Sequence, residues 1–202
     1  HLQHMIQEHF GDGSRLGVRI RYVEQVQTLG IAHAVLQVES QVDAPFLLFL
    51  GDIFYVPREL DSMLAAYRQP GVDAVLAVKE EPERALIRKN FSVRIDEEMR
   101  VSQVVEKPRY PFNNLKGCGI YLFSPEIFDA IRRTPRTALR DEYELTTAIQ
   151  VFIDDGRRVV ARDVVDWDFN VTFPADLLEC NLLALRAAGQ ENAVHETAKV
   201  HE

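Results

Sequence analysis

The chain has 202 residues, 47% of them hydrophobic, and a formal net charge of -8. This size and composition are sufficient to bury one sizeable core, so one main domain is expected. A negative chain without a run of like charges is a poor partner for nucleic acid or an anionic membrane. These 202 residues contain no run of 18 apolar residues, no signal-peptide pattern, and no metal-ligand spacing among the two cysteines and six histidines. A cytoplasmic protein is therefore expected.

The first fifty residues alternate between two kinds of pattern. Helical spacing of apolar residues predicts a helix over residues 1–10, and the turn residues Gly11-Asp12-Gly13 end it. Alternating apolar and polar side chains predict a strand over residues 18–22, and an apolar stripe predicts a helix over residues 31–40. The apolar run Phe46–Leu50 predicts a strand buried on both faces. This order is typical of a parallel sheet with crossover helices.

Later segments predict a more mixed sheet. After Asp52 we expect a helix with Pro57 near its start and an apolar face through Tyr67, then a strand over residues 72–78. Residues 91–95 and 101–105 read as an antiparallel hairpin. The remaining expectations are a strand at 115–123, a helix capped by Ser124-Pro125-Glu126, a helix at 145–153, a strand at 159–165, and a helix at 174–187 with Leu177, Leu178, Leu182 and Leu185 inward. Together they predict a mixed, mainly parallel, Rossmann-like α/β sheet flanked by helices.

The pair Gly51-Asp52 ends the buried strand that begins at Phe46. Open α/β sheets bind ligands at the carboxyl ends of their strands, and a carboxylate there is a hard oxygen ligand suited to Mg²⁺ on a phosphate. Asp52 is therefore the first candidate for chemistry. An ordinary turn that ends the strand is the alternative interpretation, because Gly-Asp is a common turn pair.

The last residues differ from the rest. Val194 and Val200 are six residues apart in the segment AVHETAKVHE. This spacing is typical of a coil of a left-handed β-helix, and a frayed tail is the alternative. The expected organisation is a domain over residues 1–189, followed by a linker or first β-helix coil over residues 190–202.

Several motifs in register resemble one family. They are DGSRLGVRIRYVEQ, LGIAHAV, FLGDIFY, VVEKP, GCGIYLFSPEIFDAI, DEYELTTAIQ and NVTFPADLLECN. In this order they resemble the sugar-1-phosphate nucleotidylyltransferases, and most closely glucose-1-phosphate thymidylyltransferases and archaeal-type bifunctional relatives. The resemblance covers about Gly11 to Leu185.

The resemblance implies an activity and its reactants. The family transfers a nucleotidyl group from a nucleoside triphosphate, here dTTP or UTP, to a sugar 1-phosphate and releases pyrophosphate. It implies Mg²⁺ as cofactor, with Asp52 as the first metal ligand beside Gly51. It places Leu29, Gly30, His33, Gly51 and Asp52 at the nucleotide. A homo-oligomer is expected.

The same resemblance assigns sugar and phosphate contacts. Glu106 contacts sugar hydroxyls and Lys107 contacts phosphate, where a mobile point charge is suited to the task. Ser92 and Gly119 also match sugar-contacting positions.

For the second metal ligand, the resemblance points to Asn170 in place of the usual aspartate. Asp168, two residues earlier and on the same face of an extended strand, is the alternative.

The chain also departs from the family pattern. The glycine-rich loop with which the family opens does not precede the motifs quoted above, so a truncated domain is expected. Two alternative functions stay open. One is a catalytically silent regulatory subunit that binds sugar nucleotides, and the other is the N-terminal part of a bifunctional protein with a β-helix acyltransferase.

Overall fold

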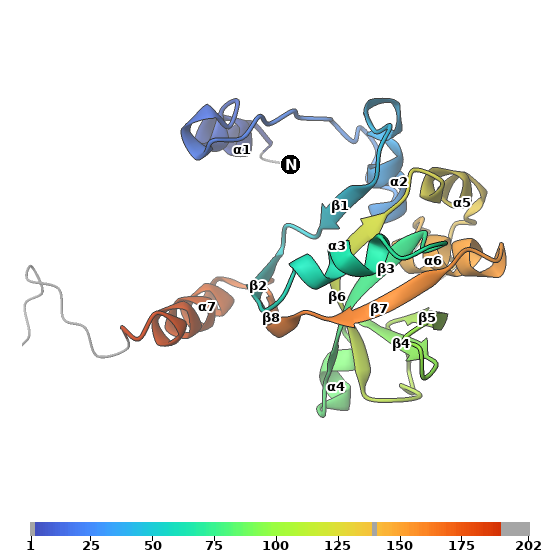
Figure 1. The fold of residues 1–202 in the computed structure, drawn as a ribbon. Helices are drawn as coiled ribbons and strands as arrows, with labels where there is room; N and C mark the ends of the chain where they lie inside the picture. The colour runs from blue at the N-terminus through green and yellow to red at the C-terminus, as the bar shows by residue number, and fades with distance from the viewer. Residues whose placement is uncertain (1–2, 139–140, 191–202) are drawn as a thin grey trace, which may run out of the picture. The chain divides into compact units, whose positions relative to one another are not determined.

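A computed structural model describes residues 3–138 and 141–190 of the protein (Figure 1). The chain forms two compact units. The first contains the described residues up to Phe46 together with Ser124–Gly156, and the second contains Leu47–Phe123 together with the described residues from Arg157 onward.

A six-stranded sheet forms most of the second unit. Its strand order is β5-β4-β6-β3-β7, and β1 also pairs with β6. The strands are β1 (Phe46–Phe49), β3 (Ala74–Glu80), β4 (Phe91–Ile95), β5 (Val101–Glu106), β6 (Leu115–Phe123) and β7 (Val159–Asp163). β3 is parallel to β7 and antiparallel to β6, whereas β4 is antiparallel to both β5 and β6. The predicted α/β class with a mixed sheet is confirmed.

The core of the second unit lies around β6. Eight of its nine residues are buried, which explains why the sequence pattern marked this strand so clearly. Helix α3 (Asp61–Tyr67) contacts β3, β6 and β7 and buries Met63 and Ala66 in the same apolar cluster as Ile120. A short helix, α4 (Arg84–Ile87), lies between β3 and β4 and was not predicted.

A two-stranded ribbon completes the second unit before its last helix. β2 (Ile53–Pro57) pairs antiparallel to β8 (Val165–Asn170), and helix α7 (Pro174–Ala187) follows. The helix expected after Asp52 is present as α3, but its expected start near Pro57 was wrong. Ile53–Pro57 is rich in aromatic and β-branched residues and pairs with β8, and the helix begins only at Asp61. The strand expected at 159–165 is divided between β7 and β8.

The first unit is helical. Its elements are α1 (Gln3–Phe10), a 3₁₀ turn (Ser14–Leu16), α2 (Ile31–Leu36), a second 3₁₀ turn (Glu39–Gln41), α5 (Ile127–Arg133) and α6 (Leu145–Asp154). α5 and α6 pack against each other, and α2 contacts both.

The strand expected at residues 18–22 was wrong. These residues are mostly exposed, and the Ile20 amide donates to the Asp12 carbonyl at 2.8 Å. The Tyr22 hydroxyl donates to the Gly11 carbonyl at 2.7 Å. The backbone and side chain of this segment are thus bound to the nearby turn, and among the described residues no strand pairs with it.

Two expectations of burial were also wrong. β1 is not buried on both faces, because Leu47 and Phe49 are 46% and 45% exposed and alternate with half-buried neighbours. In α7 the predicted inward leucines, Leu177, Leu178, Leu182 and Leu185, are all exposed, and Cys180 is the buried residue of the helix. Apolar spacing predicted the helix correctly but not the direction of its faces.

The expected cap of α5 differs as well. Glu126 precedes the first helical residue, and no side chain caps the helix. The Ser124 hydroxyl is buried and has no hydrogen-bond partner among the described residues.

The segment 191–202, which contains most of the predicted linker or β-helix coil, lies outside the described residues. Within the described part, no helix has the length and apolar character needed to cross a membrane.

Replacing Ile120 with alanine should destabilise the second unit. Ile120 is fully buried in β6, so we expect a loss of about 2–5 kcal/mol in the free energy of unfolding. Leu182→Ala, at an exposed position of α7, is the control and should change it by less than about 0.5 kcal/mol. Chemical denaturation measures both, and equal losses would contradict this account of the core.

Candidate functional site

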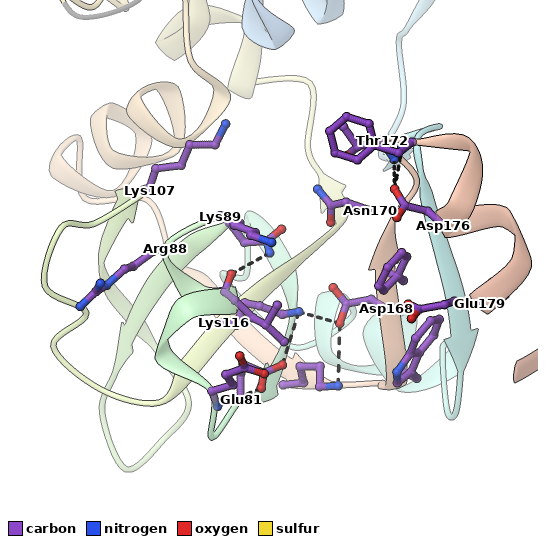
Figure 2. Close-up of a pocket in the computed structure, with 17 residues that line it drawn as sticks. Glu81, Arg88, Lys89, Lys107, Lys116, Asp168, Asn170, Thr172, Asp176 and Glu179 are labelled. Atoms are coloured by element: carbon purple, nitrogen blue, oxygen red, sulfur yellow. Dashed lines mark hydrogen bonds and ion pairs between the residues drawn. The ribbon is translucent and has the colours of Figure 1, made fainter.

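A pocket of about 930 Å³ opens in the second unit (Figure 2). Charged side chains of both signs line it, five basic and five acidic, together with three aromatic residues. These are Lys79, Arg88, Lys89, Lys107, Lys116, Glu81, Glu83, Asp168, Asp176, Glu179, Trp167, Phe169 and Phe173. Charges of both signs with aromatic faces suit a ligand that is charged at one end and ring-shaped at the other.

The end of the β2–β8 ribbon brings two predicted metal ligands together. Ile53 pairs in register with Asn170, and the Val171 amide donates to the Asp52 carbonyl at 2.8 Å. Asp52 is exposed, and Asn170 lines the pocket. Two residues that are far apart in the sequence are thus neighbours because two strands pair.

This pair fits Mg²⁺ of the kind that binds with a substrate. In the part of the chain that the structure describes, no three His, Cys, Asp or Glu side chains form a metal cluster. Mg²⁺ bound with phosphates needs only one or two protein oxygens, because water and phosphate supply the others. Asp52 supplies a charged oxygen and Asn170 a neutral one, so the donor set is consistent with a magnesium ion held partly by its substrate.

Lys107 stands at the pocket wall on an unusual backbone. Its φ is +39°, and its amide donates to the Asn90 carbonyl at 2.8 Å. A left-handed backbone at a non-glycine residue is strained and is often found at functional sites. The side chain is exposed, so its ammonium can reach a ligand. Glu106, the preceding residue, ends β5 opposite Phe91.

A buried charge network that the motifs did not predict forms part of the pocket wall. The Lys116 ammonium donates to Asp168 Oδ1 at 2.9 Å and lies 3.8 Å from Glu81 Oε2. Lys79 lies 3.8 Å from the same Asp168 oxygen and donates to the Asp166 carbonyl. The side chains of Lys116 and Asp168 are 3% and 0% exposed. A lysine within the apolar run LKGCGIYLF was the signal in the sequence that could have revealed this network.

The carboxylate of Asp168 also affects neighbouring groups. Burial is the first cause that raises the pKa of the Tyr55 hydroxyl, and the negative charge of Asp168 is the second. The same two causes raise the pKa of the buried Cys118 thiol. Both groups therefore stay protonated at neutral pH, and Tyr55 acts as a donor, to the Gly119 carbonyl at 3.1 Å.

Three other predicted site residues occupy different surroundings. Ser92 is fully buried in β4, and its hydroxyl donates to Asn113 Oδ1 at 3.3 Å. Gly119 has a φ of +75°, and a Cβ added there would come within 2.8 Å of the Ile53 side chain. Gly51 faces open space. The pocket wall includes none of these three.

The predicted nucleotide loop belongs to the first unit. Gly30 has a φ of +99°, and a Cβ there would lie 2.6 Å from the Tyr143 carbonyl oxygen. The Tyr143 amide donates to the Leu29 carbonyl at 2.7 Å. The Gln25 side chain contacts His33 Nδ1 at 2.8 Å. The His33 ring stacks on the Tyr143 ring, with 6.2 Å between the ring centroids. Gln25 and Tyr143 hold the loop, two roles that the sequence motifs did not indicate.

Solved structures define the class of fold. A UDP-glucose pyrophosphorylase complexed with UDP-glucose has a TM-score of 0.73 and 21% identity, over 90% of this chain and 72% of that one. A putative glucose-1-phosphate thymidylyltransferase from Bacillus anthracis, in complex with a sucrose, has a TM-score of 0.75 and 19% identity, over 95% and 73%. The fold is therefore the α/β fold that these nucleotidyltransferases share.

The family model described as Nucleotidyl transferase matches residues 1–178. The chain belongs to this family, and the resemblance drawn from its motifs is confirmed.

Curated relatives agree with this assignment. The low-salt glycan biosynthesis nucleotidyltransferase Agl11 of Haloferax volcanii is 35% identical over 89% of this chain and 49% of its own length. A glucose-1-phosphate thymidylyltransferase of Streptomyces antibioticus is 34% identical over 87% and 48%. The UTP–glucose-1-phosphate uridylyltransferase AglF of Haloferax volcanii is 34% identical over 85% and 69%. The chain thus spans about half the length of the first two.

Substituting two glycines separates backbone strain from side-chain overlap. Gly119 and Gly71 have φ values of +75° and +76°, but an added Cβ overlaps neighbours only at Gly119. Each alanine variant should lose about 1–2 kcal/mol from its left-handed backbone. Gly119→Ala should lose about 1–3 kcal/mol more through overlap with Ile53 and Tyr55. Chemical denaturation compares the two, and equal losses would mean that β2 moves aside freely.

Proposed function

We propose that the protein transfers a nucleotidyl group from a nucleoside triphosphate, dTTP or UTP, to a sugar 1-phosphate and releases pyrophosphate. One observation carries the proposal: the β2–β8 ribbon sets Asp52 beside Asn170, and Asn170 lines the same pocket as Lys107. This arrangement supplies oxygen ligands and a mobile cation where two phosphorylated reactants need both.

The reaction joins two anions, so charge is its main obstacle. A phosphate oxygen of the sugar 1-phosphate forms a bond to the α-phosphorus, and the bond from that phosphorus to the bridging oxygen breaks, releasing pyrophosphate. In this proposal Lys107 binds the sugar phosphate and reduces the repulsion as the reactants approach. Asp52 and Asn170 would hold Mg²⁺, which would supply positive charge near the triphosphate and the leaving group.

The remaining assignments follow the family resemblance. Leu29, Gly30 and His33 contact the nucleotide, and Glu106 contacts sugar hydroxyls. Residue 30 must be a glycine, because a Cβ there would overlap the Tyr143 carbonyl oxygen. This close contact restricts the conformation of the loop. Ser92 and Gly119 support the sugar site through packing, since one is buried and the other approaches β2 closely.

A pyrophosphate-release assay on the full-length protein tests the proposal. UTP, dTTP, CTP, GTP and ATP are each combined with several sugar 1-phosphates in the presence of Mg²⁺. Turnover with dTTP or UTP supports it. No turnover with any pair contradicts it, and binding of sugar nucleotides without turnover would favour a silent regulatory subunit, to which the neutral Asn170 also points.

Removing the Asp52 carboxylate should abolish turnover without unfolding the protein. Asp52→Ala takes away the charged metal ligand, but the side chain is exposed and contributes little packing. We expect activity below a tenth of the wild type and a melting temperature within about 2 °C of it. Asp43→Ala, another exposed carboxylate, is the control and should keep full activity. Activity above a tenth in Asp52→Ala would exclude Asp52 as the metal ligand.

Adding a charge at residue 170 should tighten metal binding. Asn170→Asp replaces a neutral oxygen ligand with a carboxylate, and hard cations gain from each charged oxygen. The initial rate should therefore saturate at a lower Mg²⁺ concentration, by about 5- to 10-fold, which corresponds to roughly 1 kcal/mol. Asp166→Asn, on the same strand but outside the pocket wall, is the control. An unchanged Mg²⁺ dependence in Asn170→Asp would place residue 170 away from the metal.

A further inference from the structure

The carboxylate of Asp168 has one oxygen bound and one unpaired. Oδ1 accepts a hydrogen bond from Lys116 at 2.9 Å. Oδ2 is buried and has no hydrogen-bond partner among the described residues. A buried carboxylate oxygen without a partner is costly, so the site is incomplete without a further donor.

The neighbours of Asp168 decide what kind of donor fits. Lys116 and Lys79 place two ammonium groups 2.9 and 3.8 Å from Oδ1. These cations offset the charge of the carboxylate, and a divalent cation on Oδ2 would be repelled by both of them. An uncharged donor, such as a hydroxyl group, meets no such repulsion. The same argument makes Asn170 a better metal ligand than Asp168.

Asp168 lies in the pocket where the proposed sugar 1-phosphate would bind, so a sugar hydroxyl could supply the missing donor. Asp168 lies two residues before Asn170 on β8, and both line the pocket to which Lys107 also contributes. Figure 2 shows Asp168 directly below Asn170, with Lys116 extending toward both Asp168 and Glu81. A ligand whose phosphate binds Lys107 can therefore place its ring in the pocket that Asp168 also lines.

We propose that Asp168 Oδ2 accepts a hydrogen bond from a ring hydroxyl of the sugar 1-phosphate, which makes Asp168 a specificity-determining residue held in place by Lys116. The inference rests on the proposed function for the class of ligand. It assigns Asp168 to sugar selection and leaves Asn170 with the metal.

Monodeoxy sugar phosphates test the hydrogen bond directly. Calorimetry on the full-length protein first measures glucose, galactose and mannose 1-phosphate, and the tightest binder serves as the parent. Its 2-, 3-, 4- and 6-deoxy analogues are then titrated. Because a hydrogen bond to a charged group is lost, one analogue should bind about 10- to 100-fold more weakly than the parent.

Variants assign that loss to Asp168. The quantity compared is the selectivity ratio, the Kd of that deoxy analogue divided by the Kd of its parent. The double variant Lys116→Met/Asp168→Leu replaces the buried pair with apolar side chains of similar size, and in it the ratio should fall below about threefold. Asp168→Asn keeps the shape and provides a second measurement should the double variant fold poorly, and it should lower the ratio at least fivefold. Asp166→Asn, an exposed carboxylate two residues earlier, is the control and should keep the wild-type ratio. Thermal melts verify that each variant is folded.

Several results would overturn the inference. The first two are equal binding of all deoxy analogues and an unchanged selectivity ratio in both Asp168 variants. The other two are no binding of any of the three parent sugar 1-phosphates, and a weaker Mg²⁺ affinity in Asp168→Asn while its selectivity ratio stays intact. The proposed function is judged separately by pyrophosphate release. Turnover with an unchanged ratio in the Asp168 variants removes only the inference, and hydroxyl selectivity without turnover removes only the proposed activity.

Discussion

The buried ion pair between Lys116 and Asp168 is the constraint on which the second unit depends. Lys116 lies on β6, the most buried strand of the sheet, and Asp168 on β8 of the ribbon. An ammonium in such a core requires a partner, because an unpaired buried charge costs several kcal/mol. The pair therefore ties the ribbon to the sheet, and the positions of Tyr55 and Asn170 on that ribbon follow from it.

Some side chains of the pocket wall are fixed by burial and hydrogen bonds, and others are exposed and flexible. Lys116 and Asp168 are enclosed and hydrogen-bonded, so they present a fixed pattern to a ligand. Lys107 is exposed, so its side chain is free to adjust to an anionic ligand. Its left-handed backbone, held by Asn90, fixes where that flexible side chain begins. The proposed sugar-phosphate ligand would need both properties, a ring held in one orientation and a charge matched as it moves.

Much of the fold could be predicted because its signals are local. β6 and α7 have the predicted bounds, and the hairpin of β4 and β5 lies where alternation placed it. The expectations that failed depended on partners. Residues 18–22 alternate like a strand but have no strand beside them among the described residues, whereas Ile53–Pro57 became a strand because β8 pairs with it. Alternation shows which residues can form a strand, and pairing decides which ones do.

The sequence by itself determined the family, the α/β class and the motif residues Asp52, Lys107 and Asn170, because these lie in short segments whose order along the chain is preserved. Only the tertiary structure decided that Asp52 and Asn170 are neighbours and that Lys116 reaches Asp168. The residues of that ion pair are 52 positions apart, and no local pattern records a contact over such a distance. Strand pairing and the requirement that a buried charge be compensated together created the site.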